Sequence, residues 1–460
     1  MNMKIPPTIA QILHSSPVGS ALSVQGWVRS MREGKNNAFI MLNDGSCLSG
    51  LQIVVDKEIL GEECLHGIIA GTSLCVSGEI VQSQGKGQSI EMLAKELAIL
   101  GTVDNTYPLQ KKSHSLEFLR EIPHLRGRTN TIGAVMRVRS AISLAVHEFM
   151  QQHQFYYIHT PIITSNDCEG AGEMFQATTM TPAQAVKSPD CKEDFFEQKT
   201  YLTVSGQLNV ETYCQALGRV YTFGPTFRAE NSNTPRHLAE FWMIEPEMAF
   251  CDLEGCIHLA HGLLLHLVQY VLRHCVQDIE FFDKMIRPGL IGELQAFVAA
   301  PLQTMTYDKA IELLQKSGRK FEFPCHWGAD LKSEHERYLC EEVAKAPLAL
   351  IDYPKEIKGF YMKLSPDKRT VRCVDIIAPG IGEIVGGSQR EDNYDLLLER
   401  MKECRMDIDA YQWYLDLRRY GTVPHSGFGL GLERMIMYVT GLSNIRDVIP
   451  FPRTPHPFSC

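Results

Sequence analysis

The chain lacks any long run of apolar residues. Its most apolar stretch, residues 262–272, is interrupted by His266 and Gln269, whereas a helix that crosses a membrane needs about 20 apolar residues. Residues 1–10 contain Lys4 and two prolines but no apolar core of the kind found in secretion signals. The sequence therefore predicts a cytoplasmic protein without a membrane segment.

The sequence also lacks closely spaced pairs of cysteines. The 14 cysteines are scattered and never form C-x-x-C, so we expect reduced thiols rather than a disulfide framework or a zinc site. The net charge of −9 argues against indiscriminate binding of nucleic acid. Any contact with RNA must depend on local basic patches and on shape.

The composition is that of a globular protein with more than one core. The 460 residues are 44% hydrophobic and 22% charged, which predicts two or three domains. Segments with strand and helix patterns follow one another without a regular β-α-β rhythm. That order favours an α+β fold.

Residues 223–250 predict two antiparallel strands joined by a loop. A run of turn-forming residues, N-S-N-T-P, lies in the middle, and aromatic and apolar residues alternate with polar ones on both sides. Because side chains repeat every two residues along a strand, Arg228 and Glu230 are expected to share one face. Glu245 and Glu247 are expected to share a face after the turn. Such a charged face either meets water or lines a site.

Residues 425–441 combine glycines with a helical pattern. Three glycines at alternate positions precede an apolar period that carries Arg434 near its start and Gly441 at the expected helix cap. The glycine spacing is neither G-x-G-x-x-G nor G-x-x-x-x-G-K-[ST]. It therefore predicts neither a dinucleotide loop nor a P-loop.

Together, the two stretches resemble motifs 2 and 3 of the class II aminoacyl-tRNA synthetases. The matching segments are F-R-A-E followed by R-H-L-A-E-F, and G-F-G-L-G-L-E-R. The resemblance to the asparaginyl-tRNA synthetases covers nearly the whole chain, including residues 201–208, 386–391 and 444–453. It implies an asparagine–tRNA ligase that activates L-asparagine with ATP and Mg²⁺ and transfers it to the 3′ end of tRNA(Asn).

The N-terminal part predicts a five-stranded oligonucleotide-binding (OB) barrel. Short strand patterns separated by glycine turns occur at residues 22–29, 38–45, 51–56, 73–78 and 89–94. This part also resembles the anticodon-binding barrel of the Asp, Asn and Lys synthetases. In that family the positions of Phe39, Gln52 and Glu91 bind the middle anticodon base by stacking and hydrogen bonds, and Arg29 and Arg32 would lie near the RNA backbone. By pattern alone, Phe39 could equally be a core residue.

A basic linker and a long helix follow the barrel. Residues 103–128 lack sustained periodicity and contain two prolines and five Lys or Arg residues, which are either solvated or available for phosphate contacts. From residue 131 the period is helical, and residues 157–164 then read as a strand broken by Pro161. The combination resembles motif 1 of the family, which implies a homodimer through the motif 1 helix.

The chemistry of amino-acid activation assigns roles to several residues. A carboxylate attacks the α-phosphate of ATP, and fixed positive groups must stabilise the charge on the phosphates. Arg228 and Arg434 are the expected catalytic clamp, because arginine stays charged and binds oxygens with a planar fork. Mg²⁺ needs hard oxygen ligands; the resemblance assigns this role to Glu383, also a catalytic residue, and Asp375 is the second candidate. The resemblance places three further residues at ATP: Glu230, His237 and Phe241.

Two segments predict the choice of amino acid. The resemblance implies that Arg390 binds the side-chain oxygen of the substrate, whether carboxylate or amide. Aspartate enzymes carry a lysine three residues after the glutamine that matches Gln207, whereas this chain has Val210. Burying a carboxylate with one cation instead of two costs on the order of several kcal/mol, so asparagine is the expected substrate. The resemblance adds further amino-acid-binding residues: Glu169, Glu230, Glu245, Gly387 and Ser388.

The expected architecture has three parts. They are an OB-fold anticodon-binding domain (1–102), a hinge (103–128) and a class II catalytic domain with an antiparallel sheet and flanking helices (129–460). Residues 281–345 read as a helical insertion to which the sequence assigns no chemistry.

Other functions fit parts of the sequence. An aspartyl-tRNA synthetase is the closest alternative, and a lysine at position 210 would favour it. An asparagine synthetase of related fold would lack the barrel and the linker. A noncatalytic RNA-binding paralogue would be expected to have lost one of four residues that are all present: Arg228, Glu383, Arg390 and Arg434. The H-I-G-H and K-M-S-K-S motifs of class I synthetases are absent.

Overall fold

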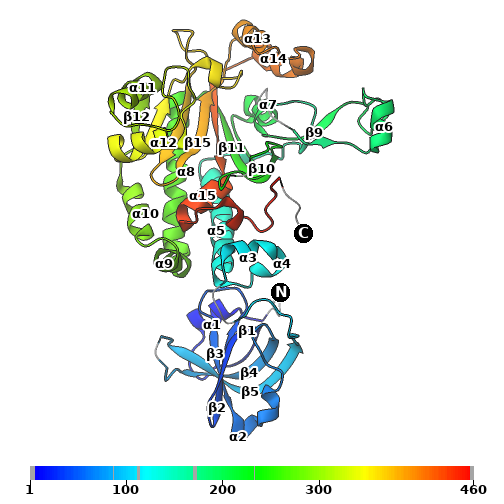
Figure 1. The fold of residues 1–460 in the computed structure, drawn as a ribbon, viewed down its shortest axis with the longest axis vertical. Helices are drawn as coiled ribbons and strands as arrows, with labels where there is room; N and C mark the ends of the chain where they lie inside the picture. Colours follow the sequence, from blue (N-terminus) through cyan, green and yellow to red (C-terminus); the bar gives the residue numbers. More distant parts are fainter. Residues whose placement is uncertain (1–5, 86, 111–113, 169–173, 233, 456–460) are drawn as a thin grey trace. The chain divides into compact units, whose positions relative to one another are not determined.

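The computed structural model describes residues 6–85, 87–110, 114–168, 174–232 and 234–455 (Figure 1). The chain divides into two compact units, one ending at Arg137 and the other beginning at Val138. The division falls within the long helix α5 (Asn130–Gln152).

The first unit contains a closed five-stranded barrel. Its strands, in spatial order, are β1 (Ala21–Glu33), β2 (Asn37–Asn43), β3 (Leu51–Asp56), β5 (Ile90–Gly101) and β4 (Ser73–Gln82). Helix α1 (Ile9–Ser15) precedes the barrel, and α2 (Lys57–Leu60) and the 3₁₀ turn η1 (Glu62–Leu65) join β3 to β4. Alternation along β2 buries Ala38, Ile40 and Leu42 in the barrel core and leaves Phe39 on the outside. The OB-fold prediction and all five predicted strands are confirmed.

The expected linker contains two short helices, α3 (Leu116–Glu121) and α4 (Pro123–Arg126). Ser115 caps α3 by accepting a hydrogen bond from a backbone N–H. Pro123 occupies the start of α4, where a missing N–H costs no helical hydrogen bond. The helices are too short to produce a periodic sequence pattern, so the segment looks irregular in the sequence.

The second unit is organised around an eight-stranded sheet, and the α+β prediction is confirmed. The strand order is β12-β13-β14-β15-β16-β11-β10-β6. The central strands are antiparallel, whereas β12 and β6 at the two edges run parallel to their neighbours. Their bounds are β6 (Tyr156–Tyr157), β10 (Arg219–Phe227), β11 (Glu240–Ala249), β12 (Gln303–Thr306), β13 (Leu348–Ile351), β14 (Cys373–Ala378), β15 (Gly382–Gln389) and β16 (His425–Gly431).

Several helices contact this sheet near its centre. Helix α8 (Leu253–His274) packs against β14, β15 and β16, α15 (Leu432–Thr440) against β11 and β16, and α7 (Gln207–Leu217) against β10 and β11. Gly441 ends α15 in the left-handed conformation, as predicted. Helix α8 is long and apolar enough to cross a membrane by length and composition alone, and it is longer than the apolar stretch we identified. Its buried leucines and valines pack in the core.

A smaller sheet lies beside the main sheet (Figure 1). The order of the smaller sheet is β7-β9-β8, formed by β7 (Ile163–Thr164), β8 (Gln176–Ala177) and β9 (Thr200–Leu202), and α6 (Pro182–Lys187) lies between β8 and β9 in sequence. Strands β6 and β7 flank Pro161, so the predicted interruption of this strand segment is confirmed. The later helices α13 (Tyr394–Glu403) and α14 (Gln412–Arg419) pack together through Leu397 and Leu415.

The insertion is not entirely helical. It contains α9 (Val276–Met285, in part), α10 (Leu290–Ala299), α11 (Tyr307–Lys316), α12 (Ser333–Arg337) and the π-helix η2 (Tyr338–Ala344), and also the edge strand β12. Strand β12 extends the main sheet beyond β13, so the insertion is built into the second unit.

Candidate active site

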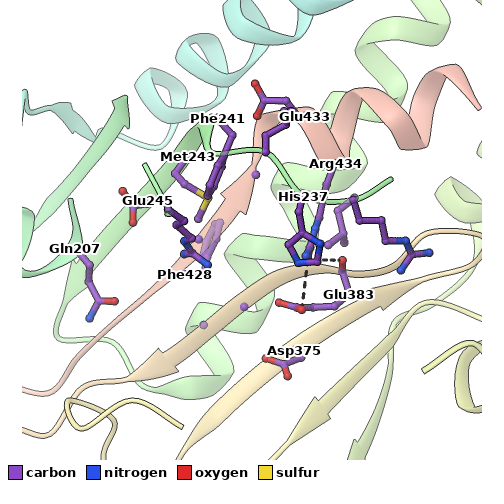
Figure 2. Close-up of a pocket in the computed structure, with 18 of the residues that line it drawn as sticks. Gln207, His237, Phe241, Met243, Glu245, Asp375, Glu383, Phe428, Glu433 and Arg434 are labelled. Atoms are coloured by element: carbon purple, nitrogen blue, oxygen red, sulfur yellow. Dashed lines mark hydrogen bonds and ion pairs between the residues drawn. The ribbon is translucent and has the colours of Figure 1, made fainter. Parts of the chain in front are cut away.

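A pocket of about 330 Å³ lies over β11, β15 and β16. It is lined by residues that are far apart in sequence: Gln207, Arg228, Glu230, His237, Phe241, Glu245, Asp375, Glu383, Gly387, Arg390 and Arg434. Gln207 and Glu245 lie toward one end, and His237, Glu383 and Arg434 toward the other (Figure 2). The pocket therefore brings together most of the predicted site residues.

Strand β11 supplies one wall of the pocket. Phe241, Met243, Glu245 and Glu247 alternate along it and all line the pocket, so the shared face predicted for the two glutamates is confirmed. The corresponding prediction for Arg228 and Glu230 is wrong, because β10 ends at Phe227 and both residues lie in the following loop. The loop nevertheless turns both toward the pocket.

The alternate glycines belong to strand β16 and leave its surface bare. A Cβ on Gly427 would lie 2.2 Å from Glu247 Oε1, and a Cβ on Gly429 would lie 2.6 Å from Met243 Cε. Both distances are too short for real side chains. The glycines therefore allow side chains of the neighbouring strand β11 to lie across β16.

One end of the pocket presents a carboxylate in a fixed position. Glu245 accepts hydrogen bonds from the hydroxyl of Ser205 and, at 3.0 Å, from the backbone N–H of Gly206. Gln207 follows at the start of α7, and its side-chain amide donates to Glu211 at 3.2 Å. A fixed acidic group next to a polar amide suits the ammonium group of an amino acid.

Arg390 is buried at the same end and is held by two partners. Its guanidinium donates twice to Glu247, with the Nε bond at 3.2 Å, and its Nη1 donates to the hydroxyl of Ser388 at 2.7 Å. Burial alone would lower the pKa of Arg390, but the Glu247 carboxylate raises it above its usual value. Arg390 is therefore a permanent, oriented cation.

The other end of the pocket is rich in cations. Arg228 lies over the Phe241 ring, with its Cζ atom 5.4 Å from the ring centroid. Arg434 donates to the backbone carbonyl of Glu383 at 3.1 Å. Burial lowers the pKa of His237, and the arginines nearby lower it further. Such a positive region suits a polyphosphate.

Two carboxylates converge beside a strand position that has no side chain. A Cβ on Gly386 would lie 3.2 Å from Glu383 Oε1 and 3.7 Å from Asp375 Oδ1. Hard oxygens with open space between them fit Mg²⁺ that takes its other ligands from phosphates and water. Asp375 also accepts a hydrogen bond from Lys358 at 2.6 Å. Within the described ranges, no three His, Cys, Asp or Glu residues form a complete metal site.

Comparison with known proteins identifies the family. Residues 115–455 match the family model for class II tRNA synthetases (D, K and N). The chain belongs to this family. Residues 22–100 also match the model of the OB-fold nucleic acid binding domain, in agreement with the barrel.

The class II synthetase resembles relatives along nearly its whole length. It is 54% identical to the asparagine–tRNA ligase of Thermosynechococcus vestitus, over 97% of this chain and 98% of the relative. It is 55% identical to that of Syntrophobacter fumaroxidans, over 95% of each chain. The crystal structure of asparaginyl-tRNA synthetase from Pyrococcus horikoshii complexed with asparaginyl-adenylate has a TM-score of 0.87 and 33% identity, covering 99% of this chain and 100% of that one.

Two of the predicted amino-acid-binding residues that the structure describes do not line the pocket. Ser388 lies behind Arg390 and bonds it. Val210 is buried in a small apolar cluster with Cys214 and Val220. Glu169 lies outside the described residues.

The insertion reaches the synthetase site, which the sequence did not indicate. Glu336 of α12 accepts a hydrogen bond from the backbone N–H of Glu383 at 3.0 Å, and Ser333 accepts one from Arg236 Nη1 at 2.8 Å. Burial, together with the neighbouring Glu383 charge, raises the pKa of Glu336 to about 7. Lys358 and Tyr361 also line the pocket without having been predicted. No spacing rule connects any of these residues to the motifs.

The predicted anticodon residues share the outer face of the barrel. Gln52 donates to Glu91 at 2.8 Å, and Glu91 also accepts from Ser83 and Gln88. Phe39 is half-buried on the adjacent strand, directly opposite the exposed Arg32 in the β1–β2 register. Arg29 instead donates to Asn43 at 3.2 Å, at an irregularity of β1.

Proposed function

We propose that this class II synthetase is an asparagine–tRNA ligase. It activates L-asparagine with ATP to asparaginyl-adenylate and pyrophosphate, and transfers the asparaginyl group to the 3′ end of tRNA(Asn). The observation that carries the proposal is that Arg390, which lines the pocket, is already paired with Glu247. The sequence offers no second cation at position 210, where it has valine. The relatives named asparagine–tRNA ligase, at 54% and 55% identity, support the same assignment.

The amino-acid end of the pocket orients the substrate. Glu245 accepts the α-ammonium group, and Gln207 lies beside it at the edge of the pocket (Figure 2). Arg390 donates to the side-chain carbonyl oxygen of asparagine. With both ends held, the α-carboxylate is left to face the α-phosphate, so positioning contributes to the rate.

The other end of the pocket stabilises the phosphates. The α-carboxylate oxygen forms a bond to the α-phosphorus, the bond to the bridging oxygen breaks, and pyrophosphate leaves. Arg228 and Arg434 neutralise the charge that accumulates on the phosphate oxygens. Glu230, His237 and Phe241 form the part of the pocket assigned to ATP. Glu383 and Asp375 would hold Mg²⁺, which supplies further positive charge to the phosphates when bound.

We infer that the outer face of the barrel binds the anticodon of tRNA(Asn). Phe39 offers an aromatic surface for stacking, and Gln52 and Glu91 offer hydrogen-bonding groups beside it. Arg32 lies opposite Phe39 and is available to phosphate. For Arg29 to contact the RNA backbone, its guanidinium must first give up the hydrogen bond to Asn43.

We infer further that the enzyme is a homodimer in the cytoplasm. Large apolar side chains are exposed on the motif 1 segment, including Leu144, Tyr156, Ile162 and Ile163. Large apolar side chains exposed on one segment favour a protein interface. Size-exclusion chromatography with light scattering should give the mass of two chains, and an Ile163→Asp variant should shift the mass toward one.

The main experiment is amino-acid-dependent ATP–pyrophosphate exchange with Asn, Asp and Lys. Exchange with Asn alone, followed by charging of tRNA(Asn), is the expected result. Exchange with Asp alone would show that the substrate is aspartate. No exchange with any of the three amino acids would contradict a catalytic function.

A further inference from the structure

Glu211 is a fully buried carboxylate beneath the amino-acid end of the pocket. It lies one helical turn after Gln207 in α7 and does not line the pocket. Its oxygens accept hydrogen bonds from Gln207 Nε2 at 3.2 Å, Tyr414 OH at 2.9 Å and Arg418 Nη2 at 3.0 Å. His425 Nε2 lies 3.3 Å from the same carboxylate. A buried carboxylate requires hydrogen-bond donors and positive partners of this kind around its oxygens.

Glu211 also faces the cation that is assigned to the substrate side chain. Its Oε1 lies 3.7 Å from Arg390 Nε, on a guanidinium that already binds Glu247. Burial alone would raise the pKa of Glu211, but Arg418, His425 and Arg390 together lower it below its ordinary range. Arg390 is therefore flanked by two buried acidic side chains, of which the nearer is Glu247.

We infer that Glu211 is a specificity-determining residue that excludes aspartate from the side-chain subsite. This inference rests on the proposed function. The negative charge of Glu211 offsets part of the field of Arg390, and charges in a buried site are weakly screened. A neutral carboxamide can still accept a hydrogen bond from Arg390. A carboxylate gains less from Arg390 and is repelled by Glu211 and Glu247.

Glu211 has a second effect through Gln207. A carboxylate only accepts hydrogen bonds, so the contact fixes the amide nitrogen of Gln207 toward Glu211. The amide oxygen is then the group of Gln207 left for other partners. An oxygen in that position accepts an N–H from a carboxamide and repels a carboxylate oxygen. Both effects favour asparagine over aspartate.

Arg418 makes the charge argument testable. It is buried, and its guanidinium pairs with Glu211 rather than with the pocket. Removing only the Glu211 charge leaves Arg418 unbalanced and makes the subsite more positive. Removing both charges restores the original balance. A packing role for Glu211 would not produce this reversal.

The test compares kcat/KM for Asp and for Asn in pyrophosphate exchange. For Glu211→Gln we expect the Asp/Asn ratio to rise roughly ten- to a hundredfold, as for one unit charge several ångströms from the substrate. The ratio is measured on one preparation, so the fraction of folded enzyme cancels. Glu211→Asp, which keeps the charge but withdraws it from Arg390, should raise the ratio by a smaller factor.

Double variants separate charge from packing. Glu211→Gln with Arg418→Gln should return the ratio toward the wild-type value. The matched control, Glu211→Gln with Arg419→Gln, removes an exposed cation instead and should keep the raised ratio. Equal losses for Asp and Asn in all variants, or a raised ratio in the Arg418 double variant, would overturn the inference. Wild-type enzyme that fails to use Asn would instead contradict the proposed function.

Discussion

The backbone N–H of Glu383 donates a hydrogen bond to the Glu336 carboxylate at 3.0 Å. Glu336 belongs to α12 in the insertion, and Glu383 is the candidate Mg²⁺ ligand on β15. A Cβ on Gly382 would lie 2.7 Å from Glu336 Oε2, so the carboxylate is packed tightly against the strand. The insertion therefore supports the start of the strand that carries Glu383.

Glu336 should make the stability of the protein depend on pH. Burial and the Glu383 charge raise its pKa from 4.5 to about 7, so between these values the folded state binds more protons than the unfolded state. The contribution is present below about pH 4.5 and is lost as pH rises toward 7. Relative to Glu336→Gln, whose amide oxygen can still accept from Glu383, the wild type should lose about 1–2 kcal/mol of unfolding free energy over this interval, after allowance for partial exposure.

Urea unfolding at pH 5.5 and 7.5, without Mg²⁺ or ATP, measures this effect. The exposed Glu342→Gln is the matched control and should follow the wild type at both pH values. Parallel changes in the wild type and Glu336→Gln would exclude Glu336 as the titrating group.

Arg434→Ala should abolish most adenylate formation while the protein stays folded. Loss of one charge-stabilising donor typically lowers the rate by ~10²–10³, and a phosphate clamp can cost more. Folding should survive because the Arg434 side chain is 36% exposed, and its ion pair with Glu383 is at the rim of the pocket rather than in the core. Pyrophosphate exchange measures the rate, and circular dichroism measures the fold.

Arg419→Ala serves as the control for Arg434→Ala. Arg419 is half exposed on α14, pairs with Asp416 and lies outside the pocket. Near-normal exchange by the Arg434 variant would remove this residue from the catalytic machinery.

The sequence predicted the parts of the site that carry a local pattern. The turn-forming run and the alternation around it indicated β10 and β11, and the glycines with the following apolar period indicated the segment that begins at His425. In the sequence, the glycines at 427, 429 and 431 predict only a segment that precedes the helix. Their role in opening the surface of β16 depends on Glu247 and Met243 of another strand, and no local pattern reports that contact.

Glu211 and Glu336 were missed for different reasons. Glu211 follows Gln207 by four residues, so both lie on one face of a helix, and this spacing could have suggested it. Glu336 lies in a five-residue helix of the insertion, 47 residues before Glu383 in sequence. Only the folded arrangement brings it to the strand.

Gly427→Ala should disrupt the amino-acid end of the pocket. The new Cβ would lie 2.2 Å from Glu247 Oε1 and 2.4 Å from the Pro246 carbonyl oxygen, so Glu247 must move away from Arg390. Overpacking of this kind costs about 1–3 kcal/mol of stability. We also expect KM for Asn to rise at least severalfold, because Arg390 loses its orienting partner.

Gly292→Ala provides the control for the glycine substitution. Gly292 lies in α10, and a Cβ added there would have no neighbouring atom within 4 Å. Alanine there should stabilise the protein slightly, by up to about 1 kcal/mol, and leave KM unchanged. Unchanged KM and stability in Gly427→Ala would contradict the proposed packing of Glu247.

Phe39→Ala should separate tRNA charging from amino-acid activation. Phe39 lies on the outer face of the barrel beside Gln52, whereas all the activation residues lie in the second unit. Removing a ring that stacks on a base typically costs about 1–3 kcal/mol, so kcat/KM for tRNA(Asn) should fall roughly ten- to a hundredfold. Pyrophosphate exchange without tRNA should be unchanged. Ile59→Ala, which truncates an exposed apolar side chain of α2, is the control and should leave both activities intact. A contact confined to the tRNA can change only the step that uses tRNA. If Phe39→Ala lowers exchange and charging equally, or if it lowers neither activity, the outer face is not the anticodon surface.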